Sequence, residues 1–106
     1  MTKVSIQVVR FLDPTSPGLV ACELVDASGH RHTLVDKVPI FTTARLDGHS
    51  SYPQAGVVAC EVISRWQDEE GRQLVRINTA KPWAVESEEG VTEFVVLSEQ
   101  VVDTAD

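Results

Sequence analysis

The chain has 106 residues, with nine Lys and Arg, sixteen Asp and Glu, and a formal net charge of −7. Residues 1–81 hold all nine basic residues and nine acidic ones, whereas residues 82–106 hold seven acids and no Lys or Arg. A DNA-binding protein needs a basic surface that neutralises phosphates. The composition therefore argues against nucleic acid as a partner.

The length predicts a single domain over residues 1–106, since cores of this size belong to chains of about 100–150 residues. Hydrophobic residues make up 42% of the chain, which is enough for a core. No apolar run approaches the roughly 20 residues of a membrane-spanning helix, and Met1–Val4 leads directly into a strand-like pattern without a signal region. These features predict a cytoplasmic protein without a membrane partner.

Valine determines the predicted fold class. The chain has 17 Val and 4 Ile against 7 Leu and 1 Met. Side chains branched at Cβ lose rotamer freedom in helices and pack well on pleated sheets. We therefore expect an all-β protein.

The first predicted strand is Val4–Leu12, in which the alternation of apolar and polar residues slips at Val8–Val9, as at a β-bulge. Asp13–Gly18 holds two prolines and a glycine and is predicted to be a loop. Leu19–Asp26 and His30–Val38 then form a hairpin around a short turn.

Pro39–Gly56 is predicted to be a long connection, with a short helical turn within Pro39–Leu46. The remaining strands form two further hairpins, Val57–Gln67 with Arg72–Asn78 and Trp83–Ser87 with Val91–Leu97. The polar tail from Glu99 onward is expected to fray.

Two segments of the chain resemble each other. Gly18–Val25 and Gly56–Ile63 share Gly, Val, Ala, Cys and Glu at equivalent positions, and each leads into an Asp-x-x-Gly turn. The alternative is chance similarity between two Val-rich strands. A hairpin repeat over residues 18–39 and 56–82 predicts a small antiparallel barrel or half-open barrel of about six strands.

The repeat also predicts which side chains face the core. Alternation along a strand places Val20, Cys22 and Leu24 on one face. The second copy places Val58, Cys60 and Val62 on the equivalent face, whereas Ala21, Glu23, Ala59 and Glu61 point the other way. Both cysteines are expected to be reduced in the cytosol, although a disulfide could form if the two strands face each other.

His30 and His32 are the first candidates for a metal site, because two histidines two residues apart share one face of a strand. Asp36 extends the same face, and His49 could join them from the long connection. We prefer the interpretation that His30 and His32 are solvated beside the turn, and we predict no metal and no cofactor. The chain lacks a Gly-x-Ser-x-Gly elbow and a glycine-rich phosphate loop. We therefore expect that the protein is not an enzyme.

Both tryptophans, Trp66 and Trp83, lie in a segment that also contains three arginines and Lys81. Aromatic side chains in a basic groove can bind single-stranded nucleic acid, but Asp68, Glu69 and Glu70 nearly cancel this charge. The preferred interpretation is that the tryptophans cap the ends of the barrel.

The long connection contains Phe41, His49 and Tyr52, which could contact a partner or a small ligand. Loops of this length are often functional. The alternative is a flap that closes the barrel with Phe41 and Leu46.

The acidic hairpin Glu86–Glu93 is the other candidate contact surface. The resulting hypothesis is a non-catalytic protein-interaction module in which Glu86, Glu88 and Glu89 contact a basic partner. Self-association as a homodimer is a further expectation, because a second copy often covers an unpaired strand edge. The alternative function is a ligand-binding barrel with an enclosed apolar pocket near Trp66, Trp83 and the 39–56 loop.

Overall fold

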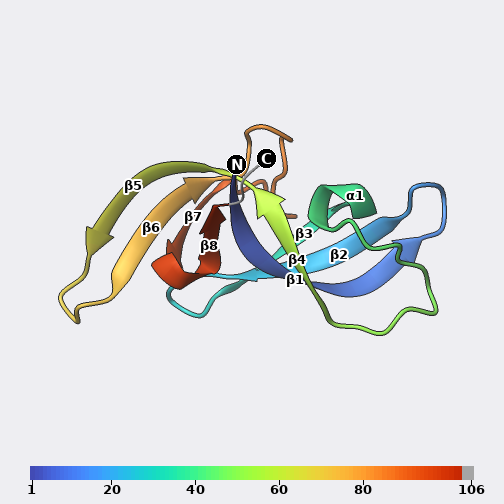
Figure 1. Ribbon diagram of the computed structural model, residues 1–106, viewed down its shortest axis with the longest axis horizontal. Helices are drawn as coiled ribbons and strands as arrows, with labels where there is room; N and C mark the ends of the chain where they lie inside the picture. Colours follow the sequence, from blue (N-terminus) through green and yellow to red (C-terminus); the bar gives the residue numbers. More distant parts are fainter. Residues whose placement is uncertain (104–106) are drawn as a thin grey trace.

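The computed structural model describes residues 1–103 and confirms the all-β class. The chain forms a five-stranded and a three-stranded antiparallel sheet, and a closed barrel is not formed by this part of the chain (Figure 1). The elements are β1 (Thr2–Asp13), β2 (Leu19–Val25), β3 (Arg31–Lys37), α1 (Val38–Phe41), β4 (Gln54–Ala59), β5 (Glu61–Gln67), β6 (Gln73–Asn78), β7 (Glu93–Leu97), the 3-10 turn η1 (Ser98–Gln100) and β8 (Val101–Asp103).

Strand β1 organises the five-stranded sheet, whose order is β3-β2-β1-β4 with β8 also paired to β1. Its first half pairs with β4 and β8, and its second half pairs with β2. The register with β2 shifts between Val8 and Arg10, which confirms the bulge predicted at Val8–Val9. The three-stranded sheet has the order β5-β6-β7.

The chain passes from one sheet to the other at Cys60, whose backbone N–H donates to the Thr2 carbonyl at 3.0 Å. The predicted single strand Val57–Gln67 is therefore two strands, β4 and β5, that follow each other directly (Figure 1). Val58, Ala59 and Cys60 are all buried, because the chain is covered on both sides where it changes sheets. Strict alternation of burial is lost there.

The core lies between the two sheets and receives valines from β1, β2, β4, β6 and β7. The inward positions predicted on β2 are confirmed, since Val20, Cys22 and Leu24 are fully buried. The second set agrees less well: Val58 and Cys60 are buried but Val62 is only half-buried. Ala21 and Ala59, predicted on the opposite face, are buried too.

The two predicted Asp-x-x-Gly turns have the same hydrogen bonds. The Oδ1 of Asp26 accepts the backbone N–H of Ser28 and His30, and the Oδ1 of Asp68 accepts those of Glu70 and Arg72. The glycine of each turn has a positive φ, which side chains with a Cβ rarely adopt. The hairpins differ in their outgoing strands, since the segment equivalent to β2 is divided between β4 and β5.

The third predicted hairpin is wrong in its first arm, because Trp83–Ser87 is not a strand and β7 pairs with β6 instead. The buried Thr79 explains this arrangement: its hydroxyl donates to the Val85 carbonyl at 2.7 Å and its N–H donates to the Thr92 carbonyl. These bonds hold the connection against the end of β6. Beyond it, Ser87 forms an isolated bridge with Leu34 at the edge of β3.

The predicted fraying from Glu99 is also wrong for residues 99–103. Val101–Asp103 pair with Thr2–Val4, because β2 leaves that side of β1 unoccupied. Gln100 fixes the preceding turn, since its side chain accepts from the Leu97 N–H and donates to the Val25 carbonyl. Residues 104–106 lie outside the described part of the chain.

The long connection contains the predicted helical turn as α1, which begins at Val38 and ends at Phe41. Within residues 1–103, no helix has the length and apolar character needed to cross a membrane.

Candidate functional site

The structure separates the aromatic residues that the sequence analysis grouped. Phe41 is 1% exposed and belongs to the core. It is therefore not available to contact a partner, and the alternative prediction, that it fills the interior, describes its position. Tyr52 packs against the core and donates its hydroxyl to the Asp47 carbonyl at 2.7 Å. His49 lines a surface depression together with Leu46 and Phe11, and neither Phe41 nor Tyr52 lines it.

The two tryptophans lie in different surroundings. Trp66 is on β5, where the Arg76 guanidinium lies 5.9 Å from its ring centre. Trp83 is 53% exposed in the connection after β6, and it faces a groove that Trp66 does not line. The acidic residues Glu86, Glu88 and Glu89 are all exposed, and Glu88 is fixed by its N–H, which donates to the Thr33 carbonyl.

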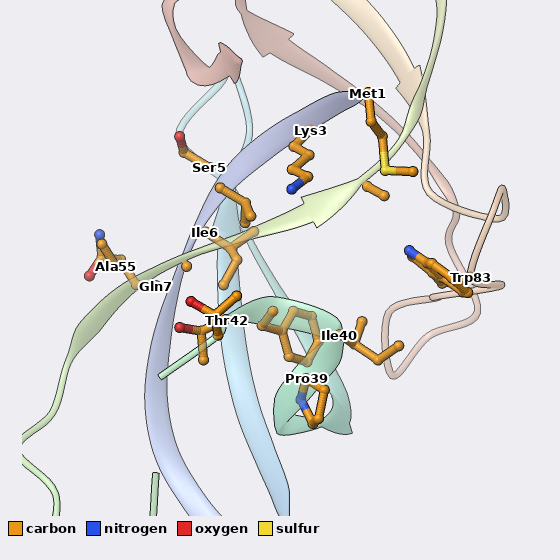
Figure 2. A pocket seen from close by; sticks show the side chains of 15 residues that line it. Met1, Lys3, Ser5, Ile6, Gln7, Pro39, Ile40, Thr42, Ala55 and Trp83 are labelled. Atoms are coloured by element: carbon orange, nitrogen blue, oxygen red, sulfur yellow. The ribbon is translucent and has the colours of Figure 1, made fainter. Parts of the chain in front are cut away.

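The groove beside Trp83 has a volume of about 690 Å³ and follows the outer edge of β4 (Figure 2). In this view Lys3 and Ser5 of β1 lie on one side of β4, and α1 lies on the other side with Pro39 and Ile40 (Figure 2). Trp83 stands beyond the end of β4. The lining combines small apolar residues of β4 with a few polar groups: Ala55, Val57, Ala59, Lys3, Ser5, Gln7 and Thr42.

Gly56 allows the C-terminal end of α1 to pack directly against β4. A Cβ at Gly56 would be 2.9 Å from the Ile6 Cδ1 and 3.0 Å from the Phe41 carbonyl oxygen. A glycine inside a strand often marks the close approach of another backbone segment. The floor of the groove is therefore set by the contact between Gly56 and the C-terminal end of α1.

The outer edge of β4 is open. Within residues 1–103, β4 pairs only with β1, and no backbone hydrogen bond from another segment reaches its other side. In an antiparallel pair, every second residue directs its N–H and C=O away from the partner strand. Strand β4 (Gln54–Ala59) thus presents unpaired backbone groups to the groove, and it contains no charged residue.

The outer edges of β3 and β7 are covered by other segments. Ser87 and Glu88 bond to the edge of β3, and the Ala27 N–H donates to the Val95 carbonyl at the edge of β7. Strand β5 has a free edge, but it carries Glu61 and Arg65 and an irregularity after Val62. Charges and bulges are the usual protection of edge strands, and β4 has neither.

His30 and His32 lie next to each other, with ring centres 4.5 Å apart, beside the first Asp-x-x-Gly turn. The Nε2 of His32 is 2.8 Å from Asp26 Oδ2, and its ring meets Phe94 edge-on at 4.8 Å. Among residues 1–103, no group of three or more His, Cys, Asp or Glu side chains is placed to hold a metal ion. His30 is exposed as predicted, but the predicted solvation is wrong for His32, whose side chain is only 13% exposed because it packs between the turn and β7.

Cys22 and Cys60 are free and buried. Burial raises the pKa of Cys22 to about 12, with a further contribution from Asp36, and raises that of Cys60 to about 11, with a contribution from Asp103. A thiol reacts as the thiolate, so neither group is activated in the folded protein.

We expect both thiols to react slowly with an aromatic disulfide reagent at pH 8, at least 100-fold more slowly than in denaturant, because burial suppresses the thiolate and restricts access. The release of the reagent's chromophore, with and without urea, measures this ratio. Reaction of either cysteine at the denatured rate in native buffer would contradict the buried positions.

Comparison with protein-family models, with curated proteins and with solved structures finds no match for this chain. The groove is therefore interpreted from its own geometry. The sequence analysis placed a pocket near Trp83 and the 39–56 loop, and both line this groove, whereas Trp66 does not. It did not recognise the strand edge, although an uncharged segment around a glycine, Gln54–Ala59, was the available signal.

Proposed function

We propose that this protein is a non-catalytic protein-interaction module that binds an extended polypeptide along the outer edge of β4. The observation that carries the proposal is the open and uncharged edge of β4 inside a groove. An extended segment can add to such an edge as a further strand, with main-chain hydrogen bonds for affinity and side-chain contacts for specificity.

Trp83 supports the same site. Tryptophan is enriched among the residues that contribute most to protein interfaces, and Trp83 is more than half exposed next to the end of β4. Lys3 lies half-buried in the groove and forms no ion pair with any described residue. A backbone carbonyl or an acidic side chain of the bound segment would satisfy its ammonium group.

The alternative, a ligand-binding barrel, has less support. Buried side chains from both sheets fill the space where a barrel would hold its ligand. The open space at Trp83 is a surface groove along a strand, a shape that suits a polypeptide better than an enclosed small molecule. Binding of a basic partner by Glu86, Glu88 and Glu89 stays a prediction supported by their exposure alone.

Selection of random displayed peptides tests the proposal, with the protein immobilised at low density so that its copies stay apart. We expect the selected peptides to slow amide hydrogen exchange in Gln54–Ala59. Trp83→Ala should weaken their binding at least tenfold, because it removes the exposed indole. Peptides that leave the β4 amides unprotected would contradict the proposal.

Two variants serve as matched controls. Trp66→Ala removes the other partly exposed tryptophan, outside the groove, and should leave peptide affinity within twofold. A triple charge reversal of Glu86, Glu88 and Glu89 to lysine separates the two candidate surfaces. If the triple variant still binds the selected peptides, the groove is supported as the binding surface. If the triple variant loses peptide binding and Trp83→Ala keeps it, the acidic hairpin is the binding surface instead.

A further inference from the structure

We infer that the polypeptide bound at β4 is β4 of a second copy of this chain, paired antiparallel about a two-fold axis through Val57. This inference rests on the proposed function and identifies the partner for that groove. The pairing would join two five-stranded sheets through their β4 edges, which is the isologous arrangement typical of a homodimer.

The register follows from the faces of β4. Val57 lies opposite Ser5, on the face of the sheet that also carries Ala55 and Ala59. A two-fold axis perpendicular to the sheet keeps each face on its own side. With the axis through Val57, Val57 faces Val57 of the second copy, and Ala55 faces Ala59. Both residues of each of these cross-strand pairs are apolar.

Charge favours this surface for two copies of an acidic chain. A net charge of −7 makes two copies repel each other in general. Strand β4 carries no charge, and its neighbours on this face, Lys3, Ser5 and Gln7, include no acid. Like charges therefore do not oppose each other along the pairing strands. Charged side chains on an edge strand normally prevent it from pairing with another chain, and β4 lacks them.

The second copy would also complete the groove. A strand added along β4 passes Ile40 on α1 and approaches Trp83 near the end of β4 (Figure 2). Each copy would thus place its Trp83 against the beginning of β4 in the other copy. The apolar surface that both molecules expose separately would be buried between them.

A disulfide at the two-fold axis tests the geometry. Directly opposite Cβ atoms in an antiparallel pair are about 5 Å apart, so Val57→Cys should form a disulfide-linked dimer under mild oxidation. Ser64→Cys places an exposed cysteine on β5, another strand with a free edge, and should stay monomeric on a non-reducing gel. Cross-linking of both variants to the same extent, or of neither, would overturn the inference.

Sedimentation of non-oxidised protein gives an independent test. We expect a dimer for the wild-type chain and for Ser64→Lys, and a monomer for Val57→Lys, in which two ammonium groups would face each other across the axis. Circular dichroism verifies that each variant is folded. A folded Val57→Lys variant that remains a dimer would overturn the inference.

The two proposals fail in different ways. A wild-type protein that is monomeric at every accessible concentration, but takes selected peptides on β4, overturns pairing between copies and leaves the proposed function in place. A wild-type dimer whose β4 amides exchange as fast as in monomeric Val57→Lys overturns the assignment of β4 as the binding edge, and both proposals with it.

Discussion

Phe41→Ala is expected to destabilise the protein by about 3–5 kcal/mol, the usual cost of removing a buried phenylalanine. The ring is almost fully buried and is the largest of the fully buried side chains in the core between the sheets. Removing it leaves a cavity that Gly56 and the adjacent backbone of α1 cannot fill, because their contact is already close. The midpoint of urea unfolding should move to a lower urea concentration. The dependence of the unfolding free energy on urea concentration should change little.

Trp83→Ala is the matched control for this prediction. It removes a larger aromatic side chain that is mostly exposed in the monomer, and the expected loss is below about 1 kcal/mol when both substitutions are compared in the monomeric Val57→Lys background. Equal losses for the two variants would contradict the assignment of Phe41 to the core and Trp83 to the surface. Because Phe41 also holds α1 beside β4, its replacement should weaken binding in the groove as well.

Asp26→Asn is expected to cost about 2 kcal/mol at neutral pH and to remove part of the acid sensitivity of the fold. Burial alone would raise the pKa of Asp26, but hydrogen bonds from Ser28, His32 and the His30 backbone outweigh it and lower the pKa to about 2, from 3.8. The carboxyl side chain is only 17% exposed, so solvent screens these contacts little.

The direction of the pH effect follows from this lowered pKa. A carboxyl group that is more acidic in the folded state contributes its stabilisation above the unfolded pKa of about 3.8, and that contribution is lost as the pH falls towards about 2. Urea unfolding of the wild type should therefore show a loss of stability in this window that Asp26→Asn lacks. Parallel pH profiles for the two proteins would contradict the prediction.

Asp68→Asn provides the control, since Asp68 occupies the equivalent position in the second turn. Hydrogen bonds from Arg72 lower its pKa in the same direction. The Arg72 side chain is exposed to solvent, and such pairs contribute little to stability. The effect of Asp68→Asn should therefore be smaller than that of Asp26→Asn.

Local patterns predicted the strands and turns well. The valine content indicated the class, the slipped alternation at Val8–Val9 located the bulge, and the two Asp-x-x-Gly motifs located turns with equivalent hydrogen bonds. These features are set by residues close together in the sequence. Their geometry depends on side-chain alternation and on the positive φ of glycine, which a sequence pattern carries directly.

Long-range pairing could not be predicted in the same way. Val57–Cys60 is a continuous apolar run, and such a run does not indicate where a chain leaves one sheet for another. The partner of β7 is β6 because Thr79 bonds across to Val85 and Thr92, contacts that no local pattern encodes. The same limit applies to the site: Gln54 and Ala55 were assigned to a loop, so the open edge of β4 was not recognised.

The direct continuation of β4 into β5 has a consequence for how the molecule unfolds. The two sheets share one length of backbone at Cys60, and the Ala27 backbone connects them again through its bonds with Val95 and Arg72. Separating the sheets would expose the single core that both of them cover. The sheets therefore form one cooperative unit, in which loss of either sheet removes the support of the other.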